Sequence, residues 1–120
     1  MSNELLYVTH MLERIIMIEN FSASGRDYFI SDLKTQEAIL RCFEILGEAA
    51  TKLPESFRQK YSDIAWRQMI GMRNLLIHNY QGVNINLIWD TIITDLPPLH
   101  LAMDIILNEL MSGSQHENDH

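Results

Sequence analysis

The sequence predicts an all-α domain, an antiparallel bundle of four to five helices. Apolar residues recur three and four positions apart along most of the chain, as they do on one face of a helix. Prolines, glycines and capping residues divide this pattern into segments with short connections, which favours antiparallel neighbours. The length of 120 residues fits one domain, and 47% hydrophobic residues are enough for a modest core.

The first half of the chain predicts two long helices. The first covers residues 4–21 and ends at the Ser-Ala-Ser-Gly run of residues 22–25. A short loop with Tyr28 and Phe29 leads to the second, which covers residues 33–53, with Ser31 or Asp32 as its N-cap. The proline that follows stops this helix, and the next residues make at most a short helical turn. Small residues in the second helix permit another helix to come close: Gly47, Ala49 and Ala50.

A third helix carries the residues of greatest interest. Ser62 or Asp63 can cap it, and we expect it to continue to about Tyr80 and to end before Gly82. It has two apolar faces, of which one can pack inside the domain and the other against a second copy. These faces are formed by Trp66, Ile70 and Ile77 and by Met69, Met72 and Leu76.

The remainder of the chain predicts one more helix and a restart. Asn84 or Asn86 begins the fourth helix, and an Asp-Leu-Pro-Pro break precedes a last helical segment. We assign residues 1–111 to one domain. Residues 112–120 are polar, and their composition predicts a disordered tail.

Composition limits the possible partners. A formal charge of −7 argues against a broad basic surface for nucleic acid, so we expect weak, salt-sensitive RNA binding, no DNA binding and a basic protein partner. The one local concentration of basic residues is more typical of a solvated face than of an RNA track. It consists of Arg58, Lys60 and Arg67.

Location is predicted from what the chain lacks. Its hydrophobic runs are too short to span a membrane, and its start does not resemble a signal peptide. Cys42 is the single cysteine, which excludes an intramolecular disulfide and agrees with a reducing compartment. We therefore expect a cytoplasmic protein.

Arg73 is the most informative residue, because it places a charge on an apolar helical face. Its neighbours on that face, at a four-three spacing, are Trp66, Ile70, Ile77 and Tyr80. A guanidinium there is costly unless an anion or water meets it, and it cannot lose its proton. One interpretation is a structural ion pair with Glu44 or Glu48, and another is a bound phosphate. The two agree if a glutamate positions Arg73 for a phosphate.

The motif Arg-Asn-Leu-Leu-Ile-His-Asn-Tyr at residues 73–80 resembles the signature of the HEPN superfamily, and in particular of its HepT-like branch. Flanking blocks resemble the same branch in the same order, at residues 44–50, 70–74, 80–84 and 89–97. The resemblance implies a HEPN-like helical fold and a homodimer with the motif lining a cleft between protomers. It also implies a ribonuclease toxin of a toxin–antitoxin module, neutralised by an MntA-like nucleotidyltransferase that attaches adenylyl groups to Tyr80.

The helical wheel agrees with a site shared by two copies. Five residues rotate His78 by roughly 140° from Arg73, so the two side chains do not point to one spot within a single chain. A two-fold axis near the end of the third helix would bring both residues of both chains to a common cleft.

The side chains of the motif fit metal-independent ribonuclease chemistry. His78 can exchange a proton near neutral pH, as a general acid or base. Arg73 can clamp the scissile phosphate and stabilise its charge, and Asn74 can orient His78 or bind a phosphate oxygen. The expected ends are a 2′,3′-cyclic phosphate and a 5′-hydroxyl. We expect neither a metal nor another cofactor, because no cluster of ligands has metal-site spacing.

A second interpretation, from a different class of function, stays open. The acidic composition also fits a non-catalytic helical module whose cleft binds a nucleotide or the nucleotidyltransferase itself. Nucleotide binding that is lost in Arg73→Ala, without turnover of RNA, would distinguish this module from a ribonuclease.

Overall fold

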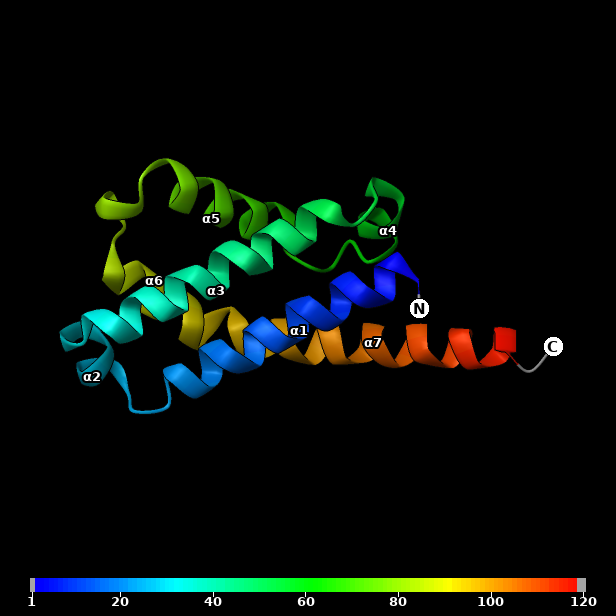
Figure 1. Ribbon diagram of the computed structural model, residues 1–120, viewed down its shortest axis with the longest axis horizontal. Coiled ribbons are helices and arrows are strands. Elements are labelled where there is room, and N and C mark those ends of the chain that lie inside the picture. The colour runs from blue at the N-terminus through cyan, green and yellow to red at the C-terminus, as the bar shows by residue number, and fades with distance from the viewer. Residues whose placement is uncertain (1, 119–120) are drawn as a thin grey trace.

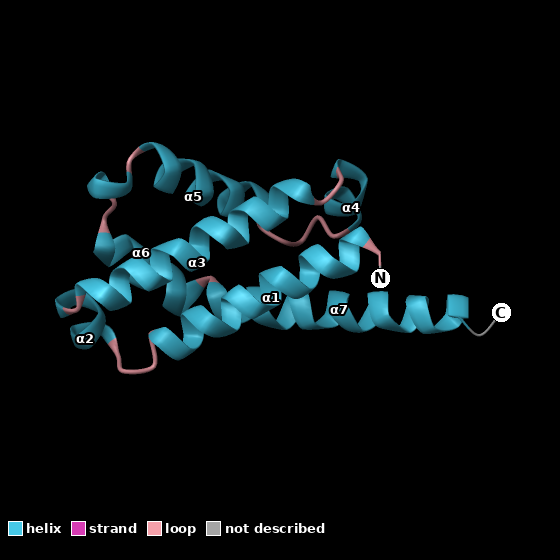
Figure 2. Ribbon diagram, viewed as in Figure 1, coloured by secondary structure: helices cyan, strands magenta, loops and turns pink. Residues whose placement is uncertain are grey.

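A computed structural model describes residues 2–118 of the chain and the side chains of residues 2–113. All secondary structure in this part of the chain is helical (Figure 2). The helices are α1 (Asn3–Phe21), α2 (Arg26–Ser31), α3 (Leu33–Lys52), α4 (Glu55–Lys60), α5 (Trp66–His78), the 3₁₀ turn η1 (Tyr80–Gly82), α6 (Ile85–Thr94) and α7 (Leu96–Asn118). The predicted all-α class is confirmed.

The long helices form an antiparallel arrangement around α3. Figure 1 shows α3 running between α1 and α5 and in the opposite direction to both. Helix α7 packs along α1, and α6 packs against α7. Apolar side chains from these helices meet in one core, whose largest fully buried members include Phe29, Met11, Ile15 and Met103. The last turns of α7 project beyond the bundle (Figure 1).

Polar caps start three of these helices. The Ser2 side chain accepts a hydrogen bond from the Leu5 backbone N–H at 3.1 Å at the start of α1. Of the two caps considered for the second long helix, Asp32 is the one used, and of the two considered for the fourth, Asn84. At the turn before α2, Gly25 has a φ of 96°, a left-handed conformation that glycine adopts without steric cost.

The start of α5 differs from the prediction. Neither Ser62 nor Asp63 caps it, because the helix begins at Trp66 after Ala65, which makes no side-chain cap bond. Burial decides this boundary: Ile64 and Trp66 both enter the core, and the Trp66 indole N–H donates to the Tyr61 carbonyl at 3.0 Å. The helix therefore begins three residues after Asp63, the second of the two predicted caps.

Two other segments are more helical than predicted. Helix α2 lies where a loop was expected. At the other end of the chain, α7 continues to Asn118, so residues 112–118 are helical where composition predicted a disordered tail. A helix that is already formed adds each further residue with one new hydrogen bond, which polar residues can also make. Residues 119 and 120 of the predicted tail lie outside the described residues.

No helix of the described residues is long and apolar enough to cross a membrane.

Candidate functional site: the end of α5 against α3

Arg73 lies where α5 comes close to α3. A Cβ added to Gly47 would overlap the Cβ of Arg73 and would lie 2.6 Å from the carbonyl oxygen of Met69. Only glycine fits there without movement of one helix, which confirms the expected close contact at this position. The absence of a side chain at residue 47 thus sets the position of Arg73 against α3.

The carboxylate that Arg73 requires is Glu48. Its Oε2 accepts hydrogen bonds from Nη2 of Arg73 at 2.7 Å and from Nε at 2.8 Å. The third bond of the guanidinium goes from Nη1 to Oδ1 of Asn74, at 2.9 Å. An arginine has five N–H donors, so two remain without a partner among the described residues. The Arg73 side chain is 29% exposed, and an incoming phosphate oxygen can therefore reach it.

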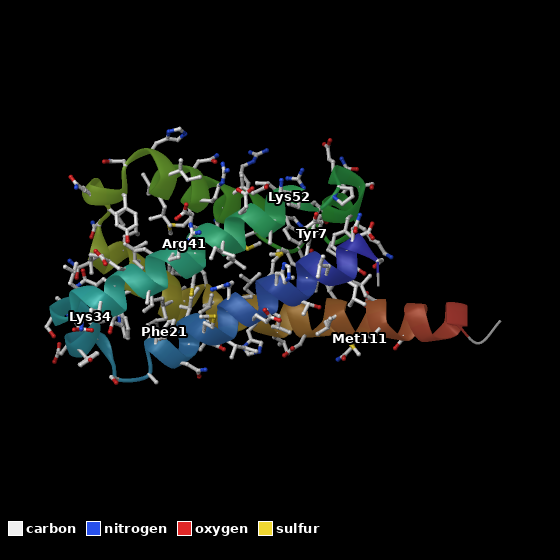
Figure 3. The ribbon with its side chains drawn as sticks, viewed as in Figure 1. Tyr7, Phe21, Lys34, Arg41, Lys52 and Met111 are labelled. Carbon is white, nitrogen blue, oxygen red and sulfur yellow. The ribbon has the colours of Figure 1, made fainter. Side chains whose placement is uncertain are left out.

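Glu44, the other carboxylate considered, has a different partner. Its Oε2 lies 3.2 Å from Nη1 of Arg41, which Figure 3 labels midway along α3. Glu48 also lies near Lys52, with 3.8 Å between Nζ and Oε1. The structure thus selects one of the two glutamates that the sequence left open.

His78 is the last residue of α5, and it is exposed. The helix is continuous from Arg73 to His78, so the rotation of roughly 140° between their side-chain directions holds in the folded chain. Asn74 lies one turn before His78 on the same face, but its carbonyl oxygen bonds to Arg73 and not to the histidine. One chain therefore brings Arg73, Asn74 and Glu48 together and leaves His78 facing solvent.

Tyr80 does not lie on the helical line of Arg73, in contrast to the prediction. The chain leaves the α-helix at Asn79, which has a φ of −149°, and Tyr80 begins the turn η1. This turn is compact, because the Asn79 side chain lies directly over Gly82, where a Cβ would come within 2.6 Å of it. The consequence is that Tyr80 turns towards α3.

The surroundings of Tyr80 are apolar and acidic. Partial burial raises the pKa of the Tyr80 hydroxyl, and the carboxylates of Glu37 and Glu44 raise it further. Tyr80 remains 39% exposed and borders a groove of about 290 Å³. The apolar residues of that groove are Leu33, Leu40, Val83 and Ile85. A partly exposed tyrosine beside a groove is a geometry that permits modification.

The predicted apolar face around Arg73 is only partly buried. Trp66 is in the core, but Ile77 is 45% exposed. The other predicted face, with Leu76 at 2% exposure, packs inside the domain. Close to the motif, exposed apolar surface therefore includes Leu75, Ile77 and Tyr80.

No group of three His, Cys, Asp or Glu side chains among the described residues is arranged to hold a metal ion. The fold and the site together define a helical domain with an arginine, an asparagine and a histidine at the accessible end of one helix. These side chains suit the binding of a phosphodiester and the transfer of protons during its cleavage.

Comparison of the sequence with known proteins assigns this domain to a family. The family model of HepT-like ribonucleases, described as "Ribonuclease HepT-like", matches residues 11–106. The chain belongs to this family, which makes it a ribonuclease by class. The match confirms the resemblance seen in the motif at residues 73–80.

Individual relatives agree. "Putative RNase TTE0752" of Caldanaerobacter subterraneus subsp. tengcongensis is 38% identical over 104 residues, which are 86% of this chain and 93% of that protein. "Probable ribonuclease HepT" of Thermococcus cleftensis is 39% identical over 94 residues, 78% of this chain and 86% of that protein. "Gamma-glutamylcyclotransferase and putative RNase MJ0434" of Methanocaldococcus jannaschii is 38% identical, and the match spans 88% of this chain and 48% of that protein. No solved structure matches the chain.

Proposed function

We propose that this chain is a metal-independent endoribonuclease toxin of a toxin–antitoxin system, which cuts RNA such as tRNA in a cleft shared by two copies. The observation that carries the proposal is the way in which the guanidinium of Arg73 is bonded and exposed. Its guanidinium is held by Glu48 and Asn74, yet it is accessible and keeps two N–H donors for a phosphate. Membership of a ribonuclease family supports RNA as the source of that phosphate.

The reaction follows from these side chains. A histidine takes the proton from a ribose 2′-hydroxyl, whose oxygen attacks the adjacent phosphorus while the bond to the 5′-oxygen breaks. A proton given to that leaving oxygen completes the exchange, so the products are a 2′,3′-cyclic phosphate and a 5′-hydroxyl. Arg73 stabilises the extra charge on the phosphate oxygens in the transition state. His78 is the residue that we assign to proton transfer, and Glu48 positions Arg73.

Two copies are part of the proposal because one chain does not complete the site. Arg73 and His78 point in different directions on α5, and the exposed apolar residues around the motif leave surface for a second copy. A homodimer that packs these surfaces together would place Arg73 of one copy across from His78 of the other. Burial of the side chains of Leu75 and Ile77 would favour this contact.

Control of the activity is assigned to Tyr80. An adenylyl transfer from ATP forms a bond between the Tyr80 oxygen and the α-phosphorus, releases pyrophosphate and transfers the phenol proton to a base. A nucleotidyltransferase antitoxin supplies that base, because the neighbours of Tyr80 raise the pKa of its hydroxyl. The added group would bring negative charge and bulk to the entrance of the cleft and so exclude RNA.

Cleavage of bulk tRNA in excess EDTA tests the catalytic residues. The protein is first shown by mass spectrometry to be unmodified at Tyr80. We expect cleavage with cyclic phosphate ends, which is lost in Arg73→Ala and His78→Ala. His10→Ala is the matched control, since His10 is an exposed histidine on α1. Intact RNA with unmodified protein would contradict the proposal, and nucleotide binding that depends on Arg73 would then favour the non-catalytic module.

A mixture of the two inactive variants tests the shared site. If Arg73 and His78 act across the dimer, half of the dimers in an equilibrated mixture are mixed, and each restores one of two sites. The mixture should therefore regain roughly a quarter of wild-type activity. No recovery in a mixture shown to exchange subunits would contradict a site built from both copies.

A further inference from the structure

A second groove of about 770 Å³ lies between α4 and the first half of α5. Both helices are at the same edge of the bundle (Figure 1). The charged and amide side chains that line the groove are Glu55, Arg58, Gln59, Arg67, Gln68 and Asn74. The basic residues that looked like a solvated face in the sequence are thus partly gathered here: Arg58 and Arg67 line one groove, which also reaches the motif at Asn74.

The wall formed by α5 leads directly to the proposed catalytic residue. Arg67, Gly71, Asn74 and His78 follow one another at intervals of four, three and four residues, which place them on one face of the helix. The first three line the groove, and the fourth ends the helix. Eleven residues at the rise of an α-helix span about 16 Å.

The two arginines lack acidic partners. Neither Arg58 nor Arg67 forms an ion pair among the described residues, and Nε of Arg58 is buried without any hydrogen-bond partner. The lining contains a single carboxylate, that of Glu55, which accepts a hydrogen bond from Gln59 at 3.4 Å. Two guanidinium groups against one carboxylate leave the groove positive, in a chain whose formal charge is −7.

Gly71 is a glycine that the packing of the chain does not explain. A Cβ added there would meet nothing within 4 Å, in contrast to Gly47. A glycine in the middle of a helix lowers stability relative to alanine. Because Gly71 has open space for a Cβ, alanine would fit there and would stabilise the helix. Because Gly71 lies in the groove wall, its lack of a side chain lets a ligand approach the helix backbone closely.

We propose that this groove binds the single strand of RNA on its way to the catalytic cleft, with Arg58 and Arg67 on other phosphates of the strand that is cut. The proposal rests on the ribonuclease function proposed above and assigns its substrate path. A positive groove that follows a phosphate backbone is how proteins hold single strands without reading sequence. It also explains how an acidic chain binds RNA: the affinity is concentrated on one narrow path.

Binding of RNA by an inactive chain tests the path without turnover. In the His78→Ala background, the affinity for a fluorescent single-stranded oligoribonucleotide is measured at several salt concentrations. Arg67→Gln should weaken binding about threefold to tenfold and lower the slope of log affinity against log salt by about 0.7, the value for one phosphate contact on a single strand. Lys34→Gln is the control, since it removes one charge at the opposite end of α3 from α4 (Figure 3). Equal effects of the two substitutions would overturn the proposal.

Gly71→Ala is a second variant that does not depend on charge. We expect its melting temperature to rise by about 2 to 5 °C, because alanine replaces a helical glycine in open space. Its affinity for the oligoribonucleotide should nevertheless fall about tenfold, because the new methyl group occupies the path. Unchanged affinity in a stabilised variant would show that RNA does not lie on this face.

The proposed function and the proposed path can fail separately. If the otherwise unchanged chain cuts RNA through His78 but Arg67→Gln and Gly71→Ala keep the same KM and affinity, the path is wrong and the function stands. If the chain does not cut RNA but the inactive chain binds it through Arg67, the path stands and the catalytic assignment fails.

Discussion

Replacement of Gly47 by alanine should loosen the contact between α3 and α5 and displace Arg73. The new Cβ would overlap the Cβ of Arg73 and lie 2.6 Å from the carbonyl oxygen of Met69, on a helix backbone that cannot simply rotate away. Ordinary contacts of a Cβ begin at about 3.4 Å, so the two helices must separate by almost 1 Å. The perturbation acts on the site itself, because Arg73 is the residue in contact.

The magnitude follows from two opposing effects. Overpacking of a close contact costs about 1–3 kcal/mol. The change from glycine to alanine inside a helix returns about 1 kcal/mol. We therefore expect a net destabilisation of up to about 2 kcal/mol, which lowers the melting temperature of a domain of this size by up to about 10 °C. A displacement of nearly 1 Å at a group that stabilises a transition state costs on the order of a hundredfold in kcat.

Thermal unfolding followed by far-UV circular dichroism measures the stability, and single-turnover cleavage of RNA measures the activity. Gly71→Ala is the matched control for stability, because it makes the same substitution in α5 with nothing within 4 Å. It should unfold at a higher temperature than the wild type, while Gly47→Ala unfolds at a lower one. If both alanine variants were equally stabilised, the close approach of α3 and α5 at Gly47 would be refuted.

Two further predictions concern charged and titrating groups. Glu48→Gln should lower kcat about tenfold, because the guanidinium of Arg73 would be held less firmly. Glu44→Gln should change kcat less than about threefold, because the carboxylate of Glu44 pairs with Arg41. Equal losses in single-turnover assays would contradict the role of Glu48. The Tyr61 hydroxyl donates a hydrogen bond to Glu109 at 2.8 Å. Burial, as the larger cause, and this bond raise the pKa of the hydroxyl from 10.0 to about 12. The stability that the bond gives the folded domain is therefore complete below pH 10 and is lost as the pH rises through 12. Tyr61→Phe should cost about 0.5–1.5 kcal/mol in urea unfolding at neutral pH and should remove the last step of the tyrosinate absorbance titration, and an unchanged titration would contradict the assignment.

Local signals predicted most of the fold correctly. The long helices follow from apolar spacing. The caps Asp32 and Asn84 could be predicted, each as one of two candidates, because a capping side chain acts on backbone groups only two or three residues away. The two errors at the ends of α5 depend on contacts that the apolar spacing does not show. The beginning of α5 at Trp66 depends on burial of its indole, and the departure of Tyr80 from the helix depends on a turn in which Asn79 folds over Gly82.

The candidate site, too, could be predicted in part from local sequence, and the rest required the folded structure. The motif residues Arg73, Asn74 and His78 are visible in the sequence by their types and spacing, and so is the need of an arginine on an apolar helical face for an anion. Sequence could not choose between Glu44 and Glu48, which lie one turn apart on the same helix. The choice requires the rotation of α3 against α5, and Gly47 determines how closely the two helices approach.

By itself, then, the sequence determined the helical class, the motif at residues 73–80 and the family resemblance, since each of these depends on residues close together in the chain. Only the tertiary structure decided that Glu48 holds Arg73, that Tyr80 faces the carboxylates of α3 and that Arg58 and Arg67 share a groove. These are contacts between separate helices. Their existence depends on how the helices pack, and packing is settled by the whole core at once.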